Sequence, residues 1–136
     1  MKIRVYSDGA SRGNPGPSAI AFIIMTNDGK TLMTHHECVG IRTNNQAEYE
    51  ALISALKAAS ELDAQEISVN IDSELLVKQI NGEYKVKEPE LKRLWLEVSE
   101  LKGRLQKVTF HHLPRTDRNM QIVDKLANQV LDELCK

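Results

Sequence analysis

Acidic residues are the side chains in this sequence whose types and positions indicate chemistry, namely Asp8, Glu48, Asp72 and Asp124. Asp8 lies where a β-prone segment gives way to turn-forming residues, and Asp72 directly follows the apolar segment 67–71. Burying an ionised carboxylate without a partner costs much free energy, so acids that meet in one buried place need cations. Hard carboxylate oxygens suit Mg²⁺ or Mn²⁺ better than zinc. The sequence therefore predicts a divalent-metal site if these acids converge.

Each acid also has a structural role that it can fill alone. Asp8 can be a turn residue, Asp72 can cap the helix that follows it, and Glu48 can close a capping box with Asn45. Asp124 can stabilise a helix dipole or simply lie in solvent. These roles do not readily hold together, because carboxylates at core-facing or strand-end positions repel one another unless cations neutralise them. Both interpretations stay open for each residue taken alone.

The spacing around Glu48 and Asp72 favours convergence. Leu52 and Leu56 follow Glu48 at i+4 and i+8, so Glu48 lies on the apolar face of its predicted helix, toward the sheet. Asp72 ends a predicted strand, and Asp8 ends another. If these two strands are parallel neighbours, both carboxylates emerge at the same edge of the sheet, which is where open α/β sheets bind ligands.

The elements that must position these acids follow from hydrophobic periodicity and turn signals. Strand patterns occupy residues 2–8, 18–25, 30–39, 65–71 and 107–113, and helix patterns occupy 46–62, 73–80, 89–103 and the segment up to Leu134 that begins near Val123. Asn45 is the expected N-cap of the first helix. The order β-β-β-α-β-α-α-β-α opens with a three-stranded meander. It predicts an α/β fold with a mixed sheet and helices packed on it.

Composition limits the classes of function. The chain has 136 residues, 41% hydrophobic and 27% charged, which predicts a single domain over residues 1–136 with one core. No apolar segment approaches the roughly 20 residues that span a membrane, and no signal peptide opens the chain. The net charge of −1 means that any binding of nucleic acid must depend on a local basic face and on metal ions.

The two cysteines, Cys38 and Cys135, show no metal-ligand spacing. The simplest interpretation is that both are reduced thiols in a cytoplasmic protein. No membrane and no obligate protein partner is expected, and the chain is expected to act as a monomer.

At this point the motifs resemble those of a known family. The sequences DGASRGNPG at 8–16, TNNQAE at 43–48, DS at 72–73 and DKLAN at 124–128 resemble the successive motifs of type 1 ribonuclease H. The resemblance covers essentially the whole chain in the right order, and the first two motifs are quite specific. It implies a five-stranded mixed sheet, with three antiparallel strands followed by two parallel ones and helices on both faces.

The resemblance also implies an activity. Members of this family are endonucleases that hydrolyse the RNA strand of RNA–DNA hybrids and leave 5′-phosphate and 3′-hydroxyl ends. By similarity, Asp8, Glu48, Asp72 and Asp124 are catalytic ligands of two Mg²⁺ ions, with Mn²⁺ as a possible substitute, and Asp8 bridges the two. Two ions ~4 Å apart would activate a water molecule and stabilise the leaving 3′ oxygen.

The resemblance further implies which residues contact the hybrid. The expected contacts are with 2′-hydroxyls and base edges in the minor groove and with a DNA phosphate. The minor-groove set is Ser11, Asn14, Asn44 and Asn45, and the phosphate set is Arg42 and Thr43. As alternatives, Asn14 and Asn45 are only turn and cap residues, and Arg42 is only a solvated side chain.

His112 best matches the family's mobile histidine, which assists proton transfer or product release; a structural histidine at a strand end is the alternative. The basic protrusion of many relatives is reduced here to Lys85 and Lys87. No additional hybrid-binding domain is expected before the core. Hybrid binding is therefore expected to be modest and salt-sensitive. Two other functions remain open, namely a binding module that does not cut and a metal nuclease for structured or double-stranded RNA.

Overall fold

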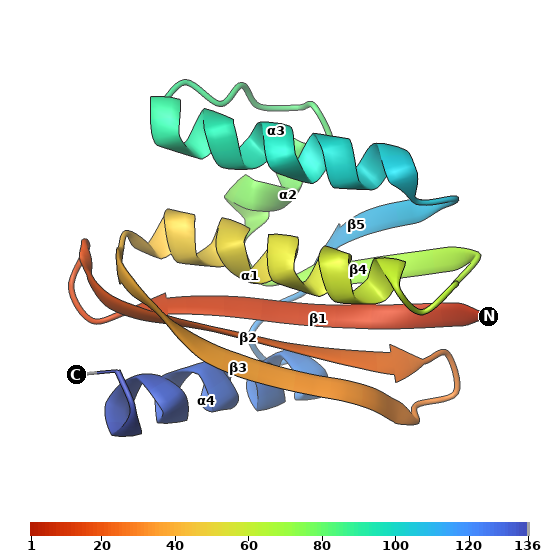
Figure 1. Cartoon of the computed structure of the whole chain (residues 1–136), viewed down its shortest axis with the longest axis horizontal. Coiled ribbons are helices and arrows are strands. Elements are labelled where there is room, and N and C mark those ends of the chain that lie inside the picture. The colour runs from red at the N-terminus through yellow and green to blue at the C-terminus, as the bar shows by residue number, and fades with distance from the viewer. Residues whose placement is uncertain (136) are drawn as a thin grey trace.

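The computed structural model describes residues 1–135 and shows one mixed sheet with helices on both faces (Figure 1). The strands lie in the order β3-β2-β1-β4-β5. Their bounds are Lys2–Ser11 for β1, Gly16–Thr26 for β2, Thr31–Arg42 for β3, Glu66–Ile71 for β4 and Val108–His112 for β5. The helices are α1 (Asn44–Ser60), α2 (Glu74–Ile80), α3 (Pro89–Arg104) and α4 (Arg118–Glu133). The predicted α/β fold, its element order and its five-stranded mixed sheet are confirmed.

The central strand β1 is longer than the sequence pattern predicts. It pairs with antiparallel β2 as far as Ser11, whereas its pairing with parallel β4 ends at Tyr6 and Asn70. The prediction that β1 stops at Asp8 is therefore wrong, because β2 keeps the strand extended beyond that residue. Asp8 nevertheless lies just past the last residue of β1 that pairs with β4. At Asp8, the edge of β1 that faces β4 is therefore open to other groups.

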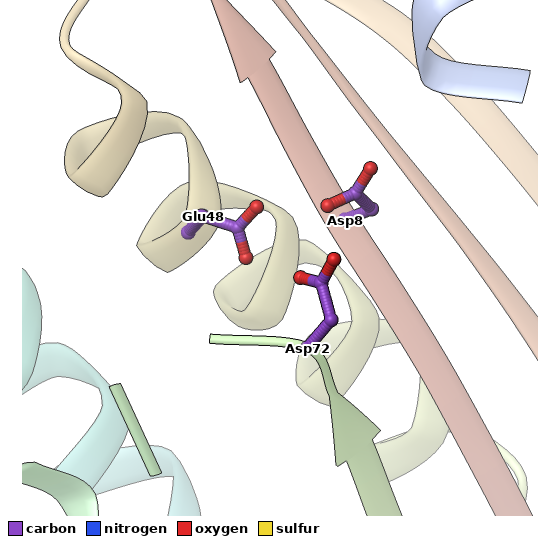
Figure 2. A group of neighbouring side chains, drawn as sticks. All are labelled: Asp8, Glu48 and Asp72. Atoms are coloured by element: carbon purple, nitrogen blue, oxygen red, sulfur yellow. The ribbon is translucent and has the colours of Figure 1, made fainter. Parts of the chain in front are cut away.

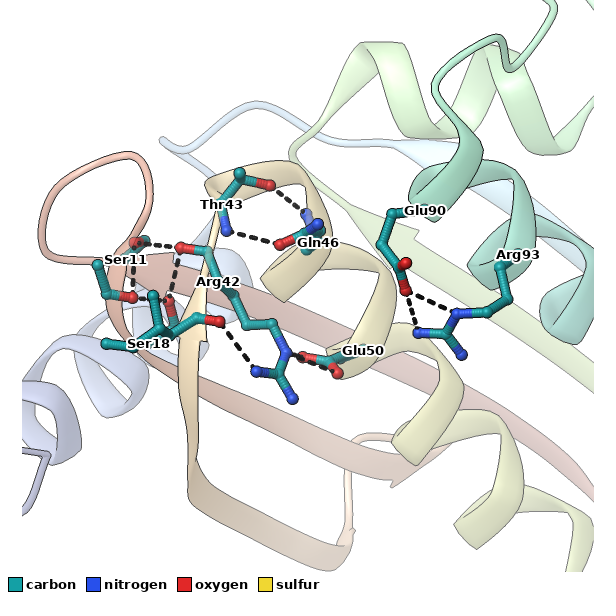
Figure 3. Close-up of polar contacts among 10 residues, drawn as sticks. Ser11, Ser18, Arg42, Thr43, Gln46, Glu50, Glu90 and Arg93 are labelled. Carbon is teal, nitrogen blue, oxygen red and sulfur yellow. Dashed lines mark hydrogen bonds and ion pairs between the residues drawn. The ribbon is translucent and has the colours of Figure 1, made fainter.

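The first helix begins with a capping box that differs from the N-cap predicted at Asn45. Thr43 is the N-cap: its Oγ1 accepts a hydrogen bond from the Gln46 N–H at 3.1 Å, and Gln46 Oε1 accepts from the Thr43 N–H at 2.9 Å (Figure 3). The predicted cap at Asn45 is wrong because Asn45 already lies inside the first turn. Since Gln46 closes the box, Glu48 has no capping role and is available to the sheet edge.

Helix α1 packs on one face of the sheet, with α2 and α3 on the same side, and α4 packs on the other face (Figure 1). Val5, Leu52 and Leu56 belong to the first hydrophobic layer, between the sheet and the helices α1, α2 and α3, and they have no exposed area. Tyr6 and Val123 belong to the second hydrophobic layer, between the sheet and α4. Because side chains alternate along a strand, β1 contributes to both layers and is fixed from both sides.

A disulfide joins Cys38 in β3 to Cys135, which follows α4. The expectation of reduced thiols is therefore wrong for this structure. The two residues are 97 positions apart in the sequence, and only the packing of the end of α4 against the sheet, through Val130 and Leu131, brings them together. In the described residues, no helix is both long and apolar enough to cross a membrane.

Candidate active site

The acids predicted from the sequence meet at one edge of the sheet. Carboxylate oxygens of Asp8, Glu48 and Asp72 lie within 4.8 Å of one another (Figure 2). Asp124 comes from α4 and lines the same cavity, which has a volume of about 440 Å³. This convergence is the arrangement that a divalent-metal site requires.

Each acid reaches the cavity from a different element. Asp72 follows the last residue of β4, and Asp8 lies on the parallel neighbour β1, so both emerge at the same edge. Asp8 shares the face of Tyr6, which packs on α4, and this places it beside Asp124. Glu48 projects from α1 and its Oε1 accepts a hydrogen bond from the Gly9 N–H at 3.2 Å.

None of the simple structural roles accounts for Asp72 or Asp124. The N-cap of α2 is Ser73, whose side chain accepts from the Leu76 N–H, so Asp72 is not the cap. Helix α4 begins at Arg118 with Asp117 as its N-cap, so Asp124 lies in the second turn rather than at the helix start. Both carboxylates are therefore available to the cavity.

Ionisation of the carboxyl groups in this cavity is unfavourable when no cation is bound. Burial raises the pKa of Asp8 far above its ordinary value, and the neighbouring Glu48 and Asp72 raise it further. Burial also raises the pKa of Glu48, while hydrogen bonds from Asp8 and the Gly9 N–H oppose that rise. Asp8 Oδ2 and Glu48 Oε2 are buried without a hydrogen-bond partner among the described residues. Orphaned carboxylate oxygens of this kind fit divalent cations, which would replace the missing partners.

Arg115 lines this cavity although the sequence motifs did not indicate a role for it. Its Nε donates to Asp72 Oδ2 at 2.9 Å, and its own side chain is 80% exposed while that of Asp72 is 5% exposed. Its charge also opposes the rise in the pKa of Glu48. The signal in the sequence was a cation in the loop between the last predicted strand and the last acid, but only the fold shows that it reaches Asp72.

The structure does not bring His112 into this cavity. His112 is the last residue of β5, it is exposed, and the cavity is lined by Arg115 from the same connection instead. The pKa of Glu74 in α2 lies below its ordinary value mainly because of the hydrogen bond with Lys78, and His112 is a minor further cause. The neighbouring His111 contacts the Thr109 hydroxyl at 2.8 Å. A role for His112 in catalysis stays a prediction that this geometry does not support.

The predicted minor-groove residues form one connected rim beside the acids. The Ser11 N–H donates to Asn44 Oδ1 at 3.1 Å, and the Asn44 N–H donates to Asn14 Oδ1 at 3.0 Å. Asn45 lines the cavity together with Ser11 and Asn44. These bonds tie the β1–β2 connection to the start of α1, so the polar groups beside the acids are held in place.

The predicted phosphate residues are engaged by protein groups. Arg42 Nε lies 3.0 Å from both carboxylate oxygens of Glu50, and the Arg42 carbonyl accepts from Ser11 Oγ at 2.9 Å (Figure 3). The Thr43 hydroxyl caps α1. Neither residue lines the acid cavity, although both border the rim described above.

Comparisons with known proteins agree with this geometry. Residues 6–130 match the family model described as "Reverse transcriptase-like". Ribonuclease HI of Halobacterium salinarum is 38% identical over 132 residues, which are 97% of this chain and 65% of that protein. The bifunctional protein Rv2228c of Mycobacterium tuberculosis is 38% identical over 133 residues, 97% of this chain and 36% of that protein. The chain thus spans less than two thirds of the length of these relatives.

Solved structures give the same result. The crystal structure of RNase H1 from Halobacterium salinarum superimposes with a TM-score of 0.93 at 38% identity, covering 98% of this chain and 99% of that one. LC11-RNase H1, solved in complex with an RNA/DNA hybrid, gives a TM-score of 0.90 at 39% identity over 96% of this chain and 97% of that one. The fold and the acid cluster define a ribonuclease H-like protein. This chain belongs to the reverse transcriptase-like family, and within it to the type 1 ribonuclease H group.

Proposed function

We propose that this protein is an endonuclease that hydrolyses the RNA strand of RNA–DNA hybrids and leaves 5′-phosphate and 3′-hydroxyl ends. The observation that carries the proposal is the approach of three carboxylates within 4.8 Å, with two of their oxygens buried and without a hydrogen-bond partner in residues 1–135. The likeness to LC11-RNase H1, which was solved with an RNA/DNA hybrid, supports the choice of substrate.

Asp8, Glu48, Asp72 and Asp124 would hold two divalent ions, and we propose Mg²⁺ with Mn²⁺ as a substitute. The chemistry supplied by such ions is activation of a water molecule and stabilisation of the leaving 3′ oxygen. The protein contributes the positions of its oxygens. Arg115 fixes Asp72, and the Gly9 N–H fixes Glu48, so these carboxylates keep one orientation before substrate arrives.

Recognition of the hybrid is assigned to the rim of Ser11, Asn14, Asn44 and Asn45, whose hydroxyl and amide groups suit 2′-hydroxyls and base edges. Arg42 and Thr43 are proposed to contact a DNA phosphate. Binding Arg42 to a phosphate requires it to share its guanidinium with Glu50.

We further propose that residues 1–136 form a single catalytic domain that acts as a monomer without an obligate protein partner. A cytoplasmic location stays a prediction. The Cys38–Cys135 disulfide does not favour it, because most cytosolic proteins keep their thiols reduced.

The proposal is tested by incubating the protein with an end-labelled RNA–DNA hybrid and Mg²⁺, beside an RNA duplex and a DNA duplex of the same sequence. We expect cleavage of the RNA strand of the hybrid only.

Asp72→Asn should abolish cleavage while circular dichroism and the melting temperature show an intact fold, because the substitution removes an anionic ligand at almost constant volume. A fully active Asp72→Asn variant would remove the basis of the assignment. Equal cleavage of the RNA duplex would indicate a broader metal nuclease, and hybrid binding without metal binding would indicate a binding module.

A further inference from the structure

We propose that Asn128 and Arg12 act as positioning residues that hold the Asp124 carboxylate toward the other acids and connect it to the β1–β2 loop. The inference rests on the proposed function, since it concerns the fourth acid of that site. Asp124, Asn128 and Arg12 all line the acid cavity. The motifs that contain Arg12 and Asn128 do not by themselves imply a role for either side chain.

The contacts form a continuous chain. Asn128 Nδ2 donates to the Asp124 carbonyl oxygen at 2.9 Å and to the Asp124 carboxylate Oδ1 at 3.3 Å. Arg12 Nη1 donates to Asn128 Oδ1 at 3.1 Å. Arg12 is itself fixed by Asp132, whose Oδ1 accepts from Arg12 Nε at 3.1 Å and from Arg12 Nη2.

The chemistry of these groups determines the orientation of the Asn128 amide. A guanidinium has only donors, so Arg12 can contact the oxygen of the amide but not its nitrogen. The nitrogen is then left facing Asp124, whose two contacting atoms are both acceptors. Without Arg12, the amide could rotate and present its oxygen to the carboxylate, which would repel Asp124 from its present position. Arg12 therefore acts on Asp124 through Asn128.

Asp124 has particular need of such support. Asp72 has the cation Arg115 as its donor, and Glu48 has the Gly9 N–H. Asp124 lies outside the group of three acids that approach within 4.8 Å, on a helix that packs against the opposite face of the sheet. Groups that orient metal ligands commonly change metal affinity or turnover about 10- to 100-fold when they are removed.

The same contacts connect Asp124 to the proposed hybrid rim. Arg12 belongs to the connection between Ser11 and Gly16, and its own N–H donates to the Pro17 carbonyl at 2.8 Å. Asn14 in this connection holds the start of α1. A displacement of this loop by bound substrate would therefore reach Asp124 through Arg12 and Asn128.

The test compares Asn128→Ala, Arg12→Ala and the double variant with the parent protein in two measurements. The first is kcat and KM on a labelled hybrid, and the second is calorimetric titration of Mn²⁺ without nucleic acid. We expect Asn128→Ala to lower kcat about tenfold, to change KM less than about twofold, and to weaken Mn²⁺ binding severalfold. Arg12→Ala should give a smaller loss of kcat, and the double variant should resemble Asn128→Ala, because both residues act through one amide.

Matched controls separate positioning from general damage. Gln129→Ala changes an exposed residue next to Asn128 on α4, and Arg104→Ala removes an exposed arginine paired with Glu100 on α3. Both should leave kcat and Mn²⁺ binding unchanged. If Asn128→Ala does not fold, the exposed Arg12→Ala still tests the inference. Unchanged kcat and Mn²⁺ affinity in Asn128→Ala, or multiplicative losses in the double variant, would overturn it. Absence of hybrid cleavage in the parent would instead contradict the proposed function, and the Mn²⁺ titration would still decide the positioning role.

Discussion

Asp8 and Glu48 are carboxylic acids in surroundings that oppose their ionisation. Asp8 is 3% exposed, and burial is the largest cause of the rise in its pKa and in that of Glu48. Two neighbouring buried carboxylates that lose their protons destabilise the folded state when no cation is bound. At the scale of single residues, the site is therefore arranged for a ligand rather than for the fold.

The raised pKa of Asp8 predicts how pH affects the metal-free protein. An unfolded aspartic acid loses its proton near pH 4, whereas folded Asp8 keeps it to a much higher pH. The folded state then binds more protons, so this contribution to stability is complete below about pH 4 and decreases as pH rises toward the raised pKa. For one retained proton the decrease approaches about 1.4 kcal/mol per pH unit.

Asp8→Asn should abolish this effect because its amide does not titrate. In EDTA, the free energy of unfolding of Asp8→Asn should exceed that of the parent by an amount that grows from pH 5 to pH 8. Urea denaturation at several pH values measures it. A difference that does not vary with pH would contradict the prediction. Adding Mg²⁺ should stabilise the parent more than the variant, because the cation replaces the proton.

At the scale of elements, the close approach of α1 to β1 places Glu48 beside Asp8. A Cβ built on Gly9 would lie 2.3 Å from the carbonyl carbon of Ala47 and 2.5 Å from the backbone N of Glu48. Real atoms do not approach so closely, so only glycine allows this contact between a strand and a helix. The same close approach allows the Gly9 N–H to donate a hydrogen bond to Glu48 Oε1.

Gly9→Ala is expected to destabilise the protein by about 3 kcal/mol, because the helix backbone must move away from the strand. Turnover on the hybrid should fall as well, since Glu48 moves with the helix. Gly103→Ala is the matched control, because a Cβ there meets nothing within 4 Å and the residue lies in α3. That control should be neutral or stabilise by up to about 1 kcal/mol. Thermal denaturation of both variants decides the matter, and a Gly9→Ala protein as stable as the parent would contradict the geometry.

At the scale of the whole molecule, the Cys38–Cys135 disulfide connects the edge strand β3 to the end of the chain segment that carries α4. It closes a loop that includes every element from α1 to α4. Long loops lose much conformational entropy in the unfolded state when they are cross-linked, so the bond should contribute substantially to stability.

Reduction should lower the free energy of unfolding by about 4.7 kcal/mol, on the chain-entropy model for a loop with a sequence separation of 97 residues. Urea denaturation with and without dithiothreitol measures this difference. Cys38→Ser should reproduce the reduced parent and should not respond to dithiothreitol. Equal stability of the oxidised and reduced parent would show that the bond contributes nothing.

Much of the fold and the site could be predicted from local patterns. Alternation in residues 2–8, the Asn27-Asp28-Gly29 turn and the helical spacing of Leu52 and Leu56 are sufficient for the element order. Strand ends and helix phase indicated Asp8, Asp72 and Glu48 as candidate ligands, and the resemblance to type 1 ribonuclease H implied the same role for Asp124. The N-cap at Thr43, the end of β1 and the pairing of the cysteines could not be predicted, because each depends on which of several competing partners lies nearby in space.

The sequence by itself determined which residue types and periodicities exist, and hence the class of fold and the acids at its sheet edge. Only the tertiary structure showed that Arg115 bonds Asp72 and that His112 lies outside the cavity. It also showed that Asn128 bonds Asp124 while Arg12 bonds Asn128. The physical reason is the difference between separation along the chain and distance in space. Hydrophobic periodicity acts between residues a few positions apart, whereas a hydrogen bond joins atoms about 3 Å apart that the chain brings together from distant segments.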